Sequence, residues 1–184
     1  MGCKDDAYML IYMLYIHKHM ETPRLSLEEI KKYLLAAKNS EKHRTLKILH
    51  QSGAELNKTI NFMLSDTYMH PHNHPKEIGK ENIERFRIIY GKIGVIFFEP
   101  RGTVEKCVIL EKGKKDYLEV LPGVWHVPVV FSDYAICYEE MRGIYNPATK
   151  QKEFATWAPQ ENSVENAPYL SLLKKEAIEK ASEA

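Results

Sequence analysis

Apolar and polar residues follow two different periods along this chain. After Ser26, apolar residues recur three or four positions apart, which predicts a helix from Leu27 to about Lys38. Ser26 and Glu29 have the spacing of a capping box, in which each side chain bonds the backbone amide of the other residue. A second helical pattern covers residues 169–182, so we expect one helix on each side of the central part of the chain.

Between these helices apolar residues recur at every second position, as they do in half-buried strands. Turn residues separate the apolar runs, for example at Pro100-Arg101-Gly102 and Pro122-Gly123. The predicted strands cover residues 59–64, 83–99 (interrupted at Gly91 and Gly94), 104–110, 117–121, 125–131 and 134–140. Many short strands at regular spacing predict a mainly β protein, either a sandwich or a barrel.

The length of 184 residues is typical of one domain with additional segments. We expect an N-terminal apolar run, a helix and a lead-in segment at residues 1–58 and a β-barrel at residues 59–145. A Pro-rich tail and a helix at residues 146–184 are expected to pack on the barrel. A chain of this size buries a sizeable core, so the fold needs neither metal nor disulfides.

The charges of the chain nearly cancel. Lys and Arg total 26 and Asp and Glu total 25, which leaves a net charge of +1. Nucleic acids and anionic membranes are usually bound through a strong positive field, so neither is expected as a partner. The 3 cysteines are too few and too scattered for a disulfide framework, which favours a reducing, cytoplasmic location.

The segment Ala7–Ile16 is an apolar run near the N-terminus. It is shorter than the roughly 20 residues that span a bilayer, and no signal-peptide cleavage pattern follows it. We therefore expect it to pack on the domain or on a partner subunit. Together with the exposed edges of a β-barrel, this run predicts a homodimer.

Three of the 8 histidines, His70, His72 and His74, occupy alternate positions. Alternate side chains of an extended segment point to one side, so His72 and His74 can present two imidazoles to one point. Neutral imidazole is a common ligand of transition metals. Taken alone, the segment is equally well explained as a polar surface loop with unrelated histidines.

A carboxylate is predicted on the inward face of the strand that begins near residue 83. Glu84 alternates with Phe86 and Ile88, while Arg85 and Arg87 share the opposite face, which we expect to be solvated. An unpaired buried carboxylate is costly, and a metal ion would offset that cost. A solvated glutamate at the end of a strand is the alternative.

A fourth candidate ligand, His126, follows the turn at Pro122-Gly123 and alternates with Pro128 and Val130. A single histidine on an apolar face is more often a core residue than a ligand. In combination with the other three candidates, we interpret His126 as a metal ligand.

These residues resemble the two metal-binding motifs of the cupin superfamily. The motifs are His72-x-His74 followed by Glu84 and Gly91, and Pro122-Gly123-x-x-His126. The resemblance implies a double-stranded β-helix, the cupin jelly-roll barrel. It also implies that His72, His74, Glu84 and His126 hold one divalent transition metal, which is Zn, Fe, Mn or Ni.

The spacing departs from the cupin motif at one point. Nine residues separate His74 from Glu84, where the motif usually has three or four. Glu77 satisfies the shorter spacing and is the alternative carboxylate ligand, although no alternating apolar strand follows it as one follows Glu84.

A narrower resemblance, over residues 27–162, is to the WbuC family of cupin-fold metalloproteins. It is carried by the lead-in helix with Ser40 to His50, by Tyr68 to Pro75, by Pro122 to His126, and by the tail from Tyr145 to Pro159. The resemblance implies a bacterial protein of surface-polysaccharide synthesis and a small, carbohydrate-like substrate. The metal would then support isomerase or epimerase chemistry. The alternatives are a carbohydrate-binding or regulatory module without turnover and an Fe(II)-dependent oxygenase.

Five further residues are predicted to contact the substrate, and a structural explanation stands beside each of them. They are His50, His70, Lys58, Tyr145 and Trp157. The histidines and the lysine are otherwise surface residues, and the two aromatic residues otherwise attach the tail to the barrel.

Overall fold

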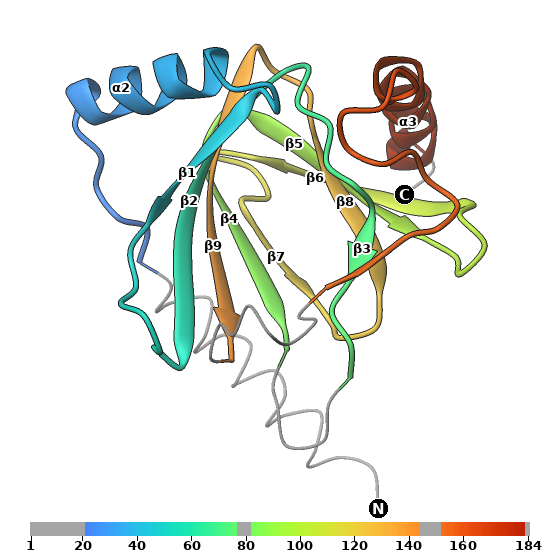
Figure 1. Cartoon of the computed structure of the whole chain (residues 1–184), viewed down its shortest axis with the longest axis horizontal. Coiled ribbons are helices and arrows are strands. Elements are labelled where there is room, and N and C mark those ends of the chain that lie inside the picture. The colour runs from blue at the N-terminus through green and yellow to red at the C-terminus, as the bar shows by residue number, and fades with distance from the viewer. Residues whose placement is uncertain (1–20, 77–81, 144–151, 183–184) are drawn as a thin grey trace, which may run out of the picture.

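The computed structural model describes residues 21–76, 82–143 and 152–182, and its strands form two antiparallel sheets that face each other (Figure 1). The first sheet has the order β1 (Arg44–Ile48), β2 (Leu56–Leu64), β9 (Tyr134–Arg142), β4 (Glu84–Tyr90) and β7 (Tyr117–Val120). The second has the order β10 (Glu153–Phe154), β3 (His72–Asn73), β8 (Trp125–Val130), β5 (Lys92–Phe98) and β6 (Val104–Glu111).

The chain passes back and forth between the two sheets. After β4 in the first sheet, β5 and β6 form a hairpin in the second, and then β7, β8 and β9 lie alternately in the first, second and first sheets. This winding is that of a jelly roll, so the prediction of a mainly β, double-stranded β-helix is confirmed. The Ala7–Ile16 run, Glu77 and Tyr145 lie outside the described residues.

The two predicted helices are present, and each packs on one part of the barrel. Helix α2 (Leu27–Lys38) begins with the expected capping box, since the Ser26 hydroxyl accepts from the amide of Glu29 and the Glu29 carboxylate accepts from the amide of Ser26. Helix α3 (Asn166–Ser182) lies against the second sheet (Figure 1) and buries an apolar stripe. The buried residues of this stripe are Leu170, Leu173 and Ala177.

One predicted strand interruption was wrong. Gly91 makes the turn between β4 and β5 with a φ of +80°, but Gly94 lies inside β5, paired with Val129 and Ile109. A Cβ atom at Gly94 would lie 2.6 Å from the Phe131 ring and 2.9 Å from the Cys107 sulfur. This glycine is therefore required for close packing on the sheet and does not interrupt the strand.

The space between the sheets is divided along the strands. At one end it is filled by a core that includes Phe86, Ile88 and Val130. At the other end the same strands line a cavity of about 470 Å³, to which β2 contributes Asn57, Thr59 and Asn61 and β9 contributes Glu139 and Met141. Residues of β4 and β8 at the boundary between these two ends therefore contact both the core and the cavity.

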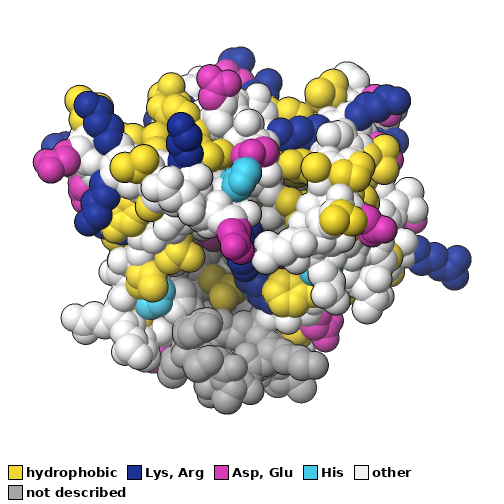
Figure 2. Space-filling view, turned by 45° about the horizontal axis from the view of Figure 1, so that its top comes forward, with side chains coloured by type: hydrophobic (Ala, Val, Ile, Leu, Met, Phe, Trp, Pro, Cys, Tyr) yellow, Lys and Arg dark blue, Asp and Glu magenta, His cyan; other side chains and the backbone are white. Residues whose placement is uncertain are grey.

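The surface of the described residues carries charges of both signs. Figure 2 shows a face on which Lys and Arg, Asp and Glu, and apolar side chains are interspersed. Arg85, which we expected on a solvated face, is instead buried, and its Nε lies 3.0 Å from Oε1 of Glu119. Neither helix of the described chain is long and apolar enough to cross a membrane.

Candidate metal centre

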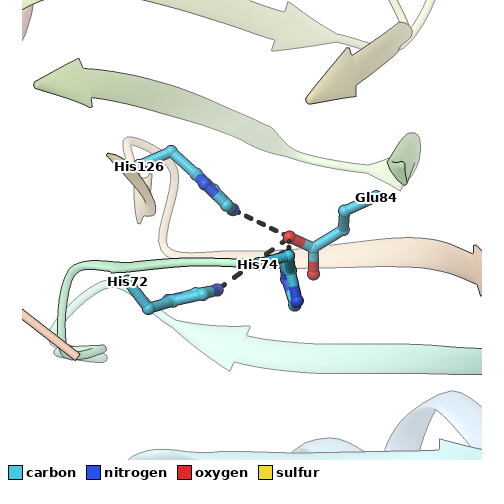
Figure 3. Close-up of side chains that lie close together, drawn as sticks. All are labelled: His72, His74, Glu84 and His126. Carbon is cyan, nitrogen blue, oxygen red and sulfur yellow. Dashed lines mark hydrogen bonds and ion pairs between the residues drawn. The ribbon is translucent and has the colours of Figure 1, made fainter. Parts of the chain in front are cut away.

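Four side chains from distant parts of the chain converge at the inner end of the cavity. They are His72 on β3, His74 just after it, Glu84 at the start of β4 and His126 on β8 (Figure 3). One nitrogen or oxygen atom from each of the four lies within 4.8 Å of the corresponding atoms of the others. All four side chains are buried, and His126 is fully inaccessible to solvent.

Strand pairing and one tight turn place the three imidazoles. Strand β3 pairs with β8 so that His72 stands directly opposite His126. The amide of Gly123 donates to the carbonyl of His74 at 2.6 Å, and Gly123 has a φ of +79°, which few residues other than glycine adopt. The turn at Pro122-Gly123 therefore holds the segment that carries His74 against the start of β8.

Two of the rings are oriented by backbone carbonyls. Nδ1 of His72 lies 3.0 Å from the carbonyl oxygen of His70, and Nδ1 of His126 lies 2.9 Å from that of Val124. With Nδ1 bonded to the backbone, Nε2 of each ring is directed at the centre of the group. Fixing one ring nitrogen in this way is how proteins commonly orient imidazole ligands toward a metal.

The Glu84 carboxylate lies between the imidazoles. Its Oε2 atom is 2.7 Å from Nε2 of His126, 3.0 Å from Nε2 of His74 and 3.9 Å from Nε2 of His72 (Figure 3). Burial alone would raise the pKa of Glu84, but the nearby Lys152 ammonium and the hydrogen bonds from His126 and His74 outweigh it and hold the pKa well below its usual range. The group therefore contains an ionised carboxylate.

The donor set fits a divalent transition metal. Burial, with the positive charge of Lys152 next in importance, lowers the pKa of His72, so its imidazole is neutral and keeps a lone pair on Nε2. Both ring nitrogens of His126 lie beside oxygen atoms that accept hydrogen bonds, whereas a neutral imidazole carries only one N–H. Both oxygens are satisfied only if the ring is doubly protonated or if a cation lies between Nε2 and Glu84. Three imidazoles and one carboxylate form a site suited to a divalent transition metal, with open positions for further ligands.

Two residues that the sequence interpretation did not select also lie at this cavity. Nζ of Lys152 is 3.0 Å from Nε2 of His72 and 3.9 Å from Oε1 of Glu84. Burial, and then the charge of Glu84, raise the pKa of Glu139 to about 8. Glu139 shares the inward face of β9 with Cys137 and Met141, so the alternation that singled out Glu84 also marks Glu139, whereas the position of Lys152 follows only from the tertiary fold.

The structure places the other residues predicted to contact the substrate in three different parts of the molecule. His50 lines the cavity, although its ring also bonds the backbone of Lys58. The Lys58 side chain lies on the opposite face of β2, beside Glu140, because it alternates with the cavity residues Asn57 and Thr59. Lys58 therefore does not line this cavity, and its contact with a substrate stays a prediction.

His70 and Trp157 belong to the outer side of the second sheet or its rim. His70 bonds the carbonyl of Ala155 and stacks on Phe154, and it lines a second groove that shares His72 and Lys152 with the cavity. Trp157 packs against Phe98 and covers Gly102, far from the cavity lining. Its ring attaches the tail to the barrel, and its contact with a substrate stays a prediction.

Comparisons with known proteins found one family model and several solved structures that are similar to part of the chain. Residues 25–110 match the model of a family described as a domain of unknown function, DUF6016. No curated protein sequence matches the chain. Similar solved structures include a cupin-2 domain protein from Shewanella frigidimarina, with 11% identity, a TM-score of 0.41 and coverage of 54% of this chain and 80% of that one.

Two further solved structures are similar to this chain over part of their length. CapF, solved with the inhibitor 3-isopropenyl-tropolone, has 15% identity and a TM-score of 0.47, with 59% of this chain and 31% of CapF covered. The DMSP lyase DddQ from Ruegeria pomeroyi has 16% identity and a TM-score of 0.47, with 64% of this chain and 54% of DddQ covered. The chain thus spans less than two thirds of the length of either protein, and the fold assignment rests on the sheet topology described above.

Proposed function

We propose that this protein is a metal-dependent cupin enzyme that acts on a small, carbohydrate-like molecule. The proposal is carried by one observation: the buried group of His72, His74, Glu84 and His126 lies at the inner end of a cavity of about 470 Å³. A site that combines an open-sided metal ligand set with a cavity of this size is typical of catalysis and not of a closed structural metal site.

The four side chains would hold one divalent transition metal, and the nitrogen-rich set suits Zn, Fe, Mn or Ni. When bound, such an ion supplies Lewis-acid chemistry, which polarises a carbonyl or hydroxyl oxygen of the substrate. Glu84 contributes the negative charge of the set because it is ionised, and His72 contributes a neutral imidazole.

Glu139 is the group that we propose for proton transfer. It lines the cavity on the strand next to β4, and its carboxyl group holds a proton up to a pH of about 8. A carboxyl with a pKa near the working pH can both release and accept a proton efficiently. Sugar isomerases and epimerases share the removal of a proton from a carbon beside a carbonyl. An isomerase returns a proton to the neighbouring carbon, and an epimerase returns it to the opposite face of the same carbon.

The remaining cavity walls suit a polyhydroxylated molecule. Asn57, Thr59 and Asn61 stand at alternate positions of β2 and face the cavity. Amide and hydroxyl side chains in this arrangement can donate and accept hydrogen bonds with successive hydroxyl groups. Apolar residues, among them Phe86 and Pro128, complete the lining and limit the access of water.

The biological setting that we propose is bacterial surface-polysaccharide biosynthesis. It is supported by the resemblance of residues 27–162 to the WbuC family, and in particular by the tail motif that includes Phe154-Ala155-Thr156-Trp157. In this setting the substrate would be a sugar or a sugar nucleotide.

A combined metal and proton-exchange experiment tests the function. Protein purified from the host is analysed for its metal by mass spectrometry and then incubated with candidate sugars in D₂O, where deuterium incorporation at carbon is followed by NMR. We expect one divalent metal per chain and incorporation that His72→Ala abolishes and that His43→Asn, a matched change outside the site, preserves. Sugar binding without deuterium incorporation would indicate a carbohydrate-binding module, and Fe(II)-dependent O₂ uptake would indicate an oxygenase.

We also propose that the protein is a homodimer. Strand β1 is an edge of the first sheet, and its apolar residues Leu46 and Ile48 are 48% and 61% exposed. Unpaired edges and exposed apolar residues are common at subunit interfaces. Analytical ultracentrifugation measures the mass, and a monomer at micromolar concentration would contradict the dimer.

A further inference from the structure

The side chain of Lys152 reaches the candidate metal centre. Its Nζ atom lies 3.0 Å from Nε2 of His72, the nitrogen that is directed at the centre of the group, and 3.9 Å from Oε1 of Glu84. The residue precedes β10, and β10 pairs with β3 so that Phe154 stands opposite His72. The tail of the chain therefore brings an ammonium group to the ligand set.

The Lys152 ammonium group can occupy this position when the four ligand residues hold no metal, but not when a metal ion is bound to them. An ammonium group bonds the His72 lone pair that a metal ion would also use. Two cations that share one nitrogen repel each other strongly in a buried site, where charges are poorly screened. The side chain of Lys152 is 39% exposed, so its ammonium group has room to turn away from the nitrogen.

Two other carboxyl groups line the cavity together with Lys152, those of Glu139 and Glu140. The Lys152 ammonium group contacts His72 and Glu84, both members of the ligand set. It interacts with Glu139 only electrostatically, and burial raises the pKa of that carboxyl to about 8, while Glu140 pairs with Lys58. The other cation of the cavity wall, Arg44, is already bonded to the Glu161 carboxylate at 2.6 Å and to the carbonyl of Tyr68 at 2.8 Å. With a divalent ion and Glu84 in place, Lys152 would add a further positive charge to the cavity, and an anionic ligand would balance it.

We infer that Lys152 is a specificity-determining residue that binds an anionic oxygen of the ligand, and that the ligand is a small hydroxylated carboxylate such as a sugar acid. The inference rests on the proposed function, since the ligand would occupy the same cavity. The carboxylate would lie between the metal position and Lys152. The hydroxyl groups would face the wall formed by Asn57, Thr59 and Asn61. A charge-assisted hydrogen bond is both stronger and more directional than one between neutral groups.

Calorimetric titration of four proteins tests this inference: the wild type, Lys152→Met, Lys152→Arg and the control Lys92→Met. Lys92 is a comparably exposed lysine on β5, beside Glu111, and does not line the cavity. Each protein is titrated first with Zn²⁺ and then, once loaded, with D-gluconate and with its neutral counterpart D-glucose. Thermal unfolding establishes that each variant is folded.

We expect Lys152→Met to weaken gluconate binding about 10- to 100-fold, because one hydrogen bond between charged groups is lost. Glucose binding should not change, and Lys152→Arg should retain gluconate binding because it keeps the positive charge. Zn²⁺ should bind more tightly to Lys152→Met than to the wild type, since no ammonium group has to leave His72.

Equal gluconate affinity in the wild type and Lys152→Met would overturn the inference, as would an equal loss of glucose affinity. These results would leave the proposed metal centre intact, because Zn²⁺ binding is measured separately. Failure of the wild type to bind Zn²⁺ would instead contradict the proposed function itself.

Discussion

His72 and His126 are direct cross-strand partners on β3 and β8, with ring centroids 4.6 Å apart. Strand β3 contains only 2 residues, so this alignment depends on β8, which is held by its long pairing with β5. In that second pairing His126 stands opposite Phe97, a core residue. The geometry of the candidate metal centre therefore depends on the pairing of β8 with β5 in the second sheet.

Removal of one imidazole should reduce metal affinity severely. We expect His126→Ala to weaken Zn²⁺ binding by more than about 100-fold, because even residues that only support a metal ligand contribute about 10- to 100-fold. Competition with a chelating dye measures the affinity. The control His43→Asn, at a histidine that pairs with Asp66 outside the site and has a φ of +53°, should bind as the wild type does.

Metal binding should stabilise the fold. At a free metal concentration about 100-fold above the dissociation constant, the gain is about 2.7 kcal/mol. For a chain of this size that gain corresponds to a rise of roughly 5–10 °C in the unfolding temperature. Scanning fluorimetry with and without a chelator checks this value, and a similar shift in His126→Ala would show that the metal acts elsewhere.

Glu139 should make the stability of the metal-free protein decrease as the pH rises. Burial raises the pKa of Glu139 from an ordinary value of 4.5 to about 8, so between these two values the folded protein retains a proton that the unfolded chain releases. The resulting penalty is absent below pH 4.5 and complete above about pH 8. Glu139→Gln should therefore be more stable than the wild type at pH 9 but not at pH 4.

Urea unfolding at these two pH values, in the presence of a chelator, measures the difference for Glu139→Gln. Its matched control is Glu140→Gln, which changes the neighbouring carboxylate beside Lys58. An equal gain in stability from Glu140→Gln, or a gain from Glu139→Gln that is already present at pH 4, would contradict the assignment of the raised pKa to Glu139.

Gly94 should tolerate no side chain. A Cβ atom there would meet the Phe131 ring at 2.6 Å and the Cys107 sulfur at 2.9 Å, so Gly94→Ala forces packed side chains apart. Overpacking of this kind costs about 1–3 kcal/mol. Chemical denaturation measures the loss, and Gly113→Asn is a suitable control because the space at Gly113 is open and asparagine tolerates its positive φ. Equal stability of Gly94→Ala and the wild type would show that the sheet adjusts freely.

Local sequence patterns were sufficient for the elements whose signals are local. The Ser26 and Glu29 capping box marked the start of α2, and alternation placed Glu84 on the inner face of β4 together with Phe86 and Ile88. The short strands β3 and β10 escaped detection, because 2 residues carry no periodicity. Gly94 was misinterpreted for a related reason: alternation does not distinguish a glycine that ends a strand from one that packs within it.

The sequence pattern by itself determined a mainly β protein with two helices. The resemblance to cupins added the jelly roll and a ligand set of three histidines and one glutamate, with Glu77 open as the alternative to Glu84. Only the tertiary structure decided which side chains share the cavity: it brought Lys152 to His72, added Glu139, turned Lys58 away and placed Trp157 on the outside of the barrel. The physical reason is that periodicity assigns a residue to a face of its own strand. Its neighbours depend on strand order and on the path of the tail, which result from packing over the whole chain.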